Sequence, residues 1–134
     1  KDAVSVPVIA NGDICTISDA REAMRLSGAD GVMIGRGIQG APWRLAEIAH
    51  GLGFDVAPKV PEGADFIAMV RDHYDAALSF YGESLGARVI RKHLGWYMDR
   101  AETPTSLRKK LLTGSSSEVR AGLGEALTPR ALAA

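Results

Sequence analysis

The sequence is poor in cysteine, histidine and long apolar runs, and each shortage excludes a class of protein. It contains one cysteine and three histidines in 134 residues. A single cysteine excludes a disulfide framework and a cysteine-rich zinc site, and it is typical of a reducing compartment. No apolar run reaches the roughly 18 residues of a membrane-spanning helix, so we expect no membrane partner. The histidines at positions 50, 73 and 93 are too dispersed to indicate a metal site.

The chain also has no net charge, but its charges are unevenly distributed. Hydrophobic residues make up 46% and charged residues 24%, a balance that excludes disorder as the main state. Residues 45–83 hold two basic and seven acidic side chains, whereas residues 84–112 hold seven basic and two acidic ones. A basic block of this kind attracts anionic partners even in a neutral chain. Two solvated helix faces that attract one another would show the same pattern, so both interpretations stay open.

The first 34 residues contain two short apolar runs that predict buried strands. Residues 6–10 are mostly β-branched and end at Asn11-Gly12-Asp13, a sequence typical of a turn. Residues 31–34 form the second run. Lys1 opens the sequence close to the first strand, and we expect the chain to be part of a longer protein.

Helix patterns follow each predicted strand. Thr16 and Asp19 have capping-box spacing, and Gly28 is a natural end for the helix that they begin. Pro42 suits the first turn of a second helix, which stops near Gly51. The order strand, helix, strand, helix predicts parallel strands covered by helices.

The remainder of the chain has a helical pattern. Residues 53–61 carry prolines and no periodicity, which predicts a linker. Beyond it, apolar residues recur with a 3.6-residue period to Tyr81 and again from Leu85, Pro104 breaks the chain, and two shorter helices follow over 105–112 and 116–127. We therefore predict an α/β portion followed by a bundle of about four helices.

The second strand leads into Gly35-Arg36-Gly37-Ile38-Gln39-Gly40. The three glycines formally match a dinucleotide fingerprint, but the acidic residue at the right distance, Asp55, falls in the linker. The alternative is that this turn and the Asn11-Gly12-Asp13 turn together hold a phosphate, as the loops after strands seven and eight of a (β/α)8 barrel do. Glycines that only permit tight turns would have the same spacing, so this possibility also stays open.

No group of residues has the pattern of a catalytic site. Cys15 has no histidine near it in the sequence, and we expect it to be a small buried residue. His73 lies on an apolar helix face, which predicts a core histidine. Asp13 and Asp30 are expected to be turn or cap residues.

The helix from Leu85 carries a basic row. Arg88, Arg91 and Lys92 are spaced i, i+3, i+4 and share one face. We expect the apolar row, Ile90, Leu94 and Tyr97, to face the bundle, with aromatic rings including Trp96 at the border of the basic row. Such a surface suits a nucleic acid, because cations neutralise phosphates and rings stack on unpaired bases. Core rings beside ordinary surface cations are the alternative.

Four motifs together identify a resemblance: VPVIANGDI, GADGVMIGRGIQGAPW, HYDAALSFYG and ARVIRKHLGWYM. They resemble the bacterial tRNA-dihydrouridine synthases, above all the B-type branch, in order and spacing from about residue 4 to about residue 112. The resemblance implies that residues 1–52 are the last two βα units of an FMN-binding TIM (β/α)8 barrel, and that residues 62–134 are a helical tRNA-binding domain. It also implies FMN as cofactor, NADPH as reductant, tRNA as partner and a cytoplasmic location.

The same resemblance assigns site residues. The cofactor-phosphate segments would be Asn11, Gly12 and Asp13 with Gly35 and Arg36, and the RNA-binding motif would be Arg88, Arg91, Lys92 and His93. Ala41 departs from the family, which usually has a polar residue there. The family's catalytic cysteine and its flavin-contacting lysine and glutamine have no counterpart in this sequence, so we expect the chain alone to be inactive.

Two alternative functions and one further expectation remain. A fragment of another FMN barrel, resembling dihydroorotate dehydrogenases, would share the two glycine turns but not the basic helix. A free-standing RNA-binding helical module is the non-catalytic alternative. Two parallel strands leave both edges open, so we expect residues 1–50 to be loosely held, rearranged or paired with a second copy in a dimer.

Overall fold

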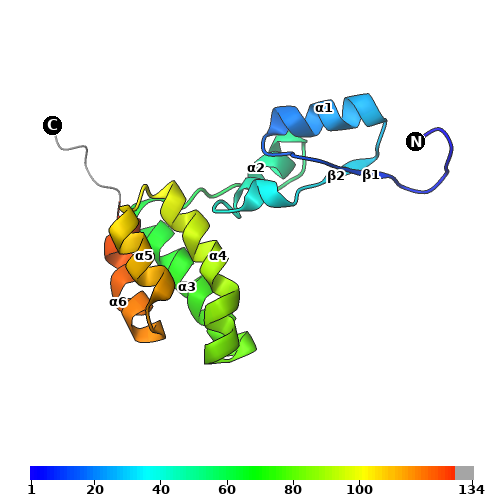
Figure 1. The fold of residues 1–134 in the computed structure, drawn as a ribbon. Helices are drawn as coiled ribbons and strands as arrows, with labels where there is room; N and C mark the ends of the chain where they lie inside the picture. Colours follow the sequence, from blue (N-terminus) through cyan, green and yellow to red (C-terminus); the bar gives the residue numbers. More distant parts are fainter. Residues whose placement is uncertain (129–134) are drawn as a thin grey trace. The chain divides into compact units, whose positions relative to one another are not determined.

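The computed structural model describes residues 1–128 and divides the chain into two compact units, Lys1–Val60 (unit 1) and Pro61 onward (unit 2). Unit 1 contains β1 (Ile9–Asn11), α1 (Ile17–Ser27), β2 (Gly31–Met33), the 3-10 helix η1 (Arg36–Ile38) and α2 (Arg44–Gly51) (Figure 1). Unit 2 contains α3 (Gly63–Tyr81), α4 (Glu83–Arg100), α5 (Thr105–Thr113) and α6 (Ser116–Leu127). Residues 129–134 of the predicted tRNA-binding domain lie outside the described residues. Over residues 1–128 the protein is therefore mostly helical, with one small sheet.

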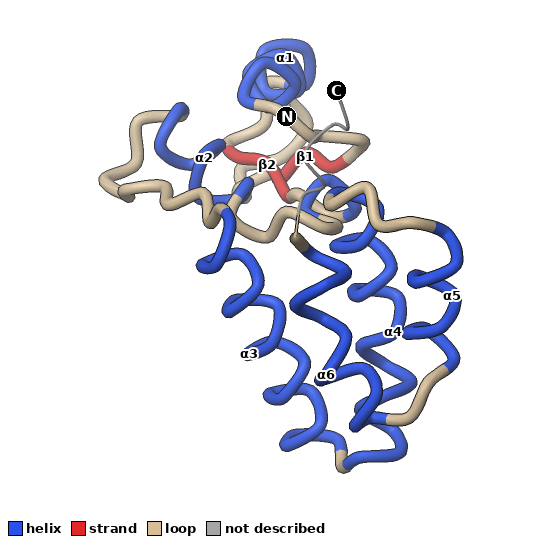
Figure 2. The backbone as a smooth tube through the Cα atoms, turned by 90° about the vertical axis from the view of Figure 1, so that its left-hand side faces the viewer, coloured by secondary structure: helices blue, strands red, loops and turns tan. Residues whose placement is uncertain are grey.

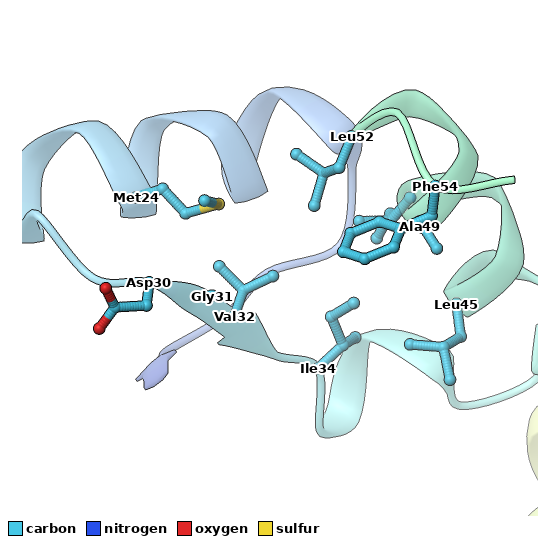
Figure 3. A pocket seen from close by; sticks show the side chains of 10 residues that line it. Met24, Asp30, Gly31, Val32, Ile34, Leu45, Ala49, Leu52 and Phe54 are labelled. Atoms are coloured by element: carbon cyan, nitrogen blue, oxygen red, sulfur yellow. The ribbon is translucent and has the colours of Figure 1, made fainter. Parts of the chain in front are cut away.

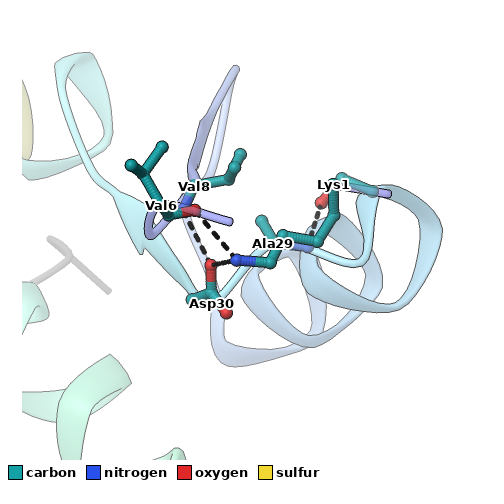
Figure 4. A network of polar contacts seen from close by, with 6 residues as sticks. Lys1, Val6, Val8, Ala29 and Asp30 are labelled. Atoms are coloured by element: carbon teal, nitrogen blue, oxygen red, sulfur yellow. Dashed lines mark hydrogen bonds and ion pairs between the residues drawn. The ribbon is translucent and has the colours of Figure 1, made fainter. Parts of the chain in front are cut away.

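The two strands pair in parallel, with Ile9 opposite Gly31 and Asn11 opposite Met33. β1 begins at Ile9, three residues later than the predicted strand, because Pro7 has no N–H to donate to a ladder. The preceding segment is held by a backbone bond from the Asp30 N–H to the Val8 carbonyl and by side-chain bonds. The carboxylate of Asp30 accepts bonds from the Val8 N–H at 2.7 Å and from Lys1 Nζ at 2.6 Å (Figure 4).

Local capping sets the helix ends of unit 1. Thr16 and Asp19 form the predicted capping box at the start of α1, and Gly28 ends the helix in the left-handed conformation at φ 64°. The prediction for Pro42 was wrong by two residues, since α2 starts at Arg44. A turn in which the Arg44 N–H bonds to the Ala41 carbonyl precedes the helix.

The strands are not buried as predicted. Helices cover the sheet face that carries Val32, where Met24 of α1 and Leu52 and Phe54 after α2 surround an apolar pocket of about 340 Å³ (Figure 3). Alternate residues of a strand point to opposite faces. Ile9 and Met33 therefore lie on the other face, where they are 56% and 49% exposed within the described part of the chain.

Unit 1 nevertheless has a core and a defined register. Ile14, Ala20 and Ile48 are buried together, and partly buried apolar residues including Val32 and Ile34 pack against them. The expectation that residues 1–50 are loosely held or rearranged stays a prediction. Pairing with a second copy stays a prediction.

Unit 2 is the predicted four-helix bundle (Figure 2). α3 and α4 form a hairpin that turns at Gly82, where φ is 78°. Near this turn Gly86 lets the helices approach closely, since a Cβ at this position would lie 2.6 Å from the Ala77 carbonyl oxygen. The largest fully buried side chains of the bundle are Val70, Tyr74, Ile90, Met98, Leu123 and Leu127. None of the helices described over residues 1–128 combines the length and apolarity needed to cross a bilayer.

Candidate functional site

The loops that follow β1 and β2 line one pocket of about 290 Å³. Because the strands are parallel, their carboxyl ends lie at the same edge of the sheet, and the two loops meet there. The pocket contains all five residues predicted to hold a cofactor phosphate. Its lining consists of Asn11, Gly12, Asp13, Ile14, Cys15, Gly35, Arg36 and Gly37.

Backbone conformation and close packing shape this pocket. Gly12 has φ 148° and Asp13 has φ 45°, so the first loop turns through conformations that most side chains avoid. Gly37 packs directly on the first loop, since a Cβ there would lie 2.1 Å from the Ile14 carbonyl oxygen. At Gly35, in contrast, no atom lies within 4 Å of an added Cβ. Gly37 thus allows the two loops to pack against each other, and Gly35 leaves open space.

An ion pair connects the two loops across the pocket. Arg36 Nη2 lies 2.7 Å from Asp13 Oδ1, and the two side chains are 79% and 83% exposed. An exposed pair of this kind contributes only about 0–1 kcal/mol. Little free energy is therefore needed to separate Arg36 from Asp13.

The prediction that Cys15 is buried was wrong. Cys15 is exposed, and the neighbouring Ile14 takes the buried position at 3% exposure. The Cys15 N–H donates to the Asp19 carboxylate of the capping box, which holds this residue ahead of α1 and outside the core. No histidine lines the pocket beside it.

Three lining residues were missed by the sequence reasoning as site residues: Ile14, Cys15 and Gly37. Gly37 had a usable signal, because it is the second glycine of the Gly35-x-Gly37 pattern. Ile14 is an apolar residue directly after a polar turn, a pattern that also indicates a residue whose side chain is buried in the core. Nothing in the sequence distinguished Cys15 as a pocket residue.

The basic row lies on the exposed face of α4. Arg88, Arg91 and Lys92 are exposed, whereas the predicted apolar row is buried, with Ile90 at 1%, Leu94 at 3% and Tyr97 at 2% exposure. No carboxylate of residues 1–128 forms an ion pair with the three cations. Other arginines of unit 2 do have such partners: Arg108 pairs with Asp99, and Arg120 pairs with Asp75. The acidic residues among 61–83, which belong to the same unit, therefore form no ion pair with this row.

A chain of rings borders the row. His73 of α3 shares a 3.0 Å hydrogen bond with the Tyr97 hydroxyl, and its ring meets that of His93 edge to face at 5.1 Å. His93 in turn contacts Trp96 at 5.0 Å. Burial lowers the pKa of both imidazoles below the ordinary 6.5, and His93 lowers the pKa of His73 further. His93, predicted as part of the basic motif, is therefore a half-buried neutral ring near pH 7.

Tyr97 does not belong to the exposed border. It is buried, its hydroxyl bonds to His73, and burial raises its pKa above 10.0. His73 has the partner expected of a core histidine. Within residues 1–128, no three His, Cys, Asp and Glu side chains are grouped as metal ligands.

Comparison with known proteins adds to this geometry. A family model described as dihydrouridine synthase (Dus) matches residues 1–131. The chain belongs to this family. A probable tRNA-dihydrouridine synthase of Rhodobacter capsulatus is 59% identical over 102 residues, which cover 76% of this chain and 32% of that protein. One from Rickettsia conorii is 47% identical, over 72% of this chain and 29% of its own length.

The matched relatives include proteins named as B-type members of the family. A protein named tRNA-dihydrouridine synthase B, from Xanthomonas axonopodis pv. citri, is 42% identical over 121 residues, covering 78% of this chain and 35% of its own length. The resemblance to dihydrouridine synthases and their B-type members is thus confirmed. The Dus chain spans about a third of the length of the curated relatives it matches. Dus membership implies a TIM-barrel type of fold, consistent with the parallel βα order of unit 1.

Proposed function

We propose that the chain is the C-terminal part of a flavin-dependent tRNA-dihydrouridine synthase, which reduces specific uridines of tRNA to 5,6-dihydrouridine with FMN and NADPH. In this proposal residues 1–52 are the last two βα units of the barrel, residues 53–61 are a linker, and residues 62–134 bind tRNA. The observation that carries the proposal is the pocket in which the loops of two parallel strands bring Asn11, Gly35 and Arg36 together in a chain of the Dus family.

The pocket residues fit the phosphate end of a flavin mononucleotide. Gly35 leaves open space beside η1, and glycine allows close approach of a phosphate to backbone N–H groups. Arg36 supplies a cation in the pocket. Its ion-pair partner is the exposed carboxylate of Asp13, from which it separates at little cost when it binds a phosphate. Asp13 is the one acidic group in the lining, and its pairing with Arg36 reduces its repulsion of an anion.

Bound FMN would supply the hydride chemistry, and this chain would supply its phosphate contacts. In this proposal Gly12, Gly35 and Arg36 bind and orient the phosphate, and none of residues 1–128 is assigned a contact with the reacting atoms. Cys15 has no histidine in the pocket lining to take its proton, and it receives no catalytic role. The chain alone therefore binds FMN poorly and reduces no uridine, because it holds the phosphate and not the ring.

The exposed row of α4 supports the tRNA-binding part of the proposal. Arg88, Arg91 and Lys92 have no carboxylate partner among residues 1–128, so their charges are available to phosphates. Each phosphate contact releases counterions, which makes affinity fall steeply with salt. Holding the tRNA outside the barrel would leave a uridine free to unstack toward the flavin.

The whole activity is tested with the protein encoded by the complete gene. Incubation with unmodified tRNA and NADPH, followed by digestion and quantification of nucleosides, is expected to give dihydrouridine above the enzyme-free control. Bound, reducible flavin without dihydrouridine would instead indicate another FMN barrel, of the dihydroorotate-dehydrogenase-like kind. Absence of both flavin and product, with tRNA still bound, would indicate an RNA-binding module.

The cofactor assignment has a sharper test in Gly35→Ala. The added methyl meets no atom within 4 Å, so it does not disturb the packing of the loop, and a thermal melt checks that the variant is folded. If phosphate occupies the space beside Gly35, the methyl blocks it, and the complete protein loses FMN on gel filtration. Retention of FMN at the level of the unchanged protein would place the phosphate elsewhere.

We also propose that the isolated chain dimerises through its sheet. Each strand has an unpaired edge within unit 1, and Val6 and Ile9 beside them are 61% and 56% exposed. Light scattering is expected to show dimers that Val6→Lys converts to monomers. Leu26→Lys, on the exposed face of α1, is the matched control and should leave the dimer intact. A monomeric unchanged chain would contradict the proposal.

A further inference from the structure

The rings beside the basic row form a continuous series from the core to the surface. Phe66 and Tyr97, both buried, meet edge to face at 6.0 Å, and Tyr97 meets His73 in the same way at 5.9 Å. His73 then contacts His93, and His93 contacts Trp96. The last three rings are half-buried, so the series is anchored inside the bundle and ends at its surface.

The surface end of this series is held rigidly. The Tyr97 hydroxyl and His73 Nδ1 are 3.0 Å apart, which sets the orientation of the His73 ring. The half-buried ring of His93 contacts His73 and Trp96 edge to face, with interplanar angles of 69° and 80°. Rings that are already ordered lose little conformational entropy when a ligand stacks on them.

The ring series and the basic row meet on one helix. Lys92 precedes His93 directly, and Arg88, Arg91 and Lys92 have no carboxylate partner among residues 1–128. Phosphate-binding cations beside exposed aromatic rings are the combination by which proteins hold unpaired nucleotides. A fully paired helix hides its base faces and offers only phosphates and sugars to such a surface.

We propose that His93 and Trp96 form a stacking ledge that takes the base of an unpaired RNA nucleotide whose phosphates lie on Arg91 and Lys92. This inference rests on the tRNA binding proposed above and deepens it. His93 contributes as a ring, because a half-buried imidazole between two other rings has little water to solvate a charge. The three cations supply the ionic part of binding, and the ledge supplies a part that salt does not screen.

Substitutions at His93 show whether its aromatic ring or a positive charge at this position contributes to RNA binding. In the full 134-residue chain, His93→Ala is expected to weaken binding of unmodified tRNA about fivefold or more, the scale of one lost stacking contact. The slope of affinity against salt stays unchanged. His93→Phe keeps a ring and is expected to retain affinity. His93→Lys is expected to lose affinity as the alanine variant does. Retention by lysine together with loss by phenylalanine would overturn the ledge.

Trp96 provides an independent spectroscopic readout. The chain has two tryptophans, so Trp43→Phe leaves Trp96 as the emitting residue. A single-stranded oligouridylate of about ten nucleotides, within the usual site size, is expected to quench Trp96, and a blunt RNA duplex is not. Equal quenching by the duplex, or none by the oligouridylate, would contradict stacking on an unpaired base.

The triple variant Arg88→Ala, Arg91→Ala, Lys92→Ala distinguishes this inference from the proposal on which it rests. Loss of tRNA affinity, with a salt slope lower by about 2 to 3, supports tRNA binding by the row. If the triple variant behaves so and His93→Ala binds normally, the ledge is wrong and tRNA binding stands. If the triple variant and His93→Ala both bind as the unchanged chain does, both are wrong. Thermal melts of each variant confirm that the bundle is intact.

Discussion

Replacing Gly86 with alanine sets two opposing effects against each other in α4. Alanine is the better helix former, by about 0.5–1 kcal/mol in a helix interior. Its methyl, however, would lie 2.6 Å from the Ala77 carbonyl oxygen and 2.8 Å from the Leu78 Cα. Both atoms belong to the backbone of α3, so no side chain can move to relieve the contact.

The steric effect should win. Ordinary contact between such atoms begins near 3.5 Å, so the two helices would have to separate by about 0.8 Å along a tightly packed interface. Overpacking of this kind costs about 1–3 kcal/mol. We therefore expect Gly86→Ala to lower the free energy of unfolding of unit 2 by about 1–2 kcal/mol. For a domain of this size that is a fall of roughly 5–15 °C in melting temperature.

Gly95→Ala is the matched control on the same helix. Its methyl meets only Arg108 Nη2, at 3.1 Å, the flexible end of a side chain that is 35% exposed. A small shift of the guanidinium weakens at most its surface pair with Asp99, which contributes about 0–1 kcal/mol. The helix preference then dominates, and the melting temperature is expected to stay constant or rise by a few degrees.

The assay follows thermal unfolding through Trp96 fluorescence in a Trp43→Phe background, so that unit 2 alone is reported. The reasoning predicts opposite signs for the two substitutions. A Gly86→Ala variant that melts at or above the temperature of the unchanged chain would refute the close approach of α3 and α4. Equal losses for both variants would refute the argument from backbone against side-chain contact.

Three further predictions concern capping, two buried hydroxyls and pH. Thr16→Ala removes the capping box of α1 and is expected to cost unit 1 about 1 kcal/mol, measured through Trp43 in a Trp96→Phe background; an unchanged midpoint would contradict it. Tyr74 has a buried hydroxyl with no hydrogen-bond partner among residues 1–128, so Tyr74→Phe should leave stability equal or higher. Tyr97→Phe breaks the bond to His73 and should lower the free energy of unfolding by about 1 kcal/mol. If chemical denaturation shows Tyr74→Phe to be less stable than Tyr97→Phe, this assignment is wrong. Because burial lowers the pKa of His73 and His93, the unfolded chain binds more protons just below pH 6.5, so the melting temperature of unit 2 should be constant above that pH and fall as the pH decreases from 6.5 to 5.5. The double variant His73→Gln, His93→Gln should lack this fall, and a fall of the same size in that variant would assign it to other groups.

The sequence by itself determined most of the helix boundaries and the family. Thr16 with Asp19, Gly28 and Pro104 act through residues at most four positions away, so their effect is visible in a short window of sequence. The motif residues at Asn11, Gly35 and Arg91 identify the Dus family in the same way, because residue type and spacing are sequence properties.

Burial and pairing were decided by the tertiary structure. Ile14, and not Cys15, enters the core because α1 and α2 close over one side of the first loop, an event that depends on residues more than 20 positions apart. Arg36 meets Asp13 only because the strands are parallel and end at one edge. His73, expected to be a core histidine, touches His93 because α3 packs on α4. Each of these contacts depends on how distant elements meet, and no local pattern encodes that meeting.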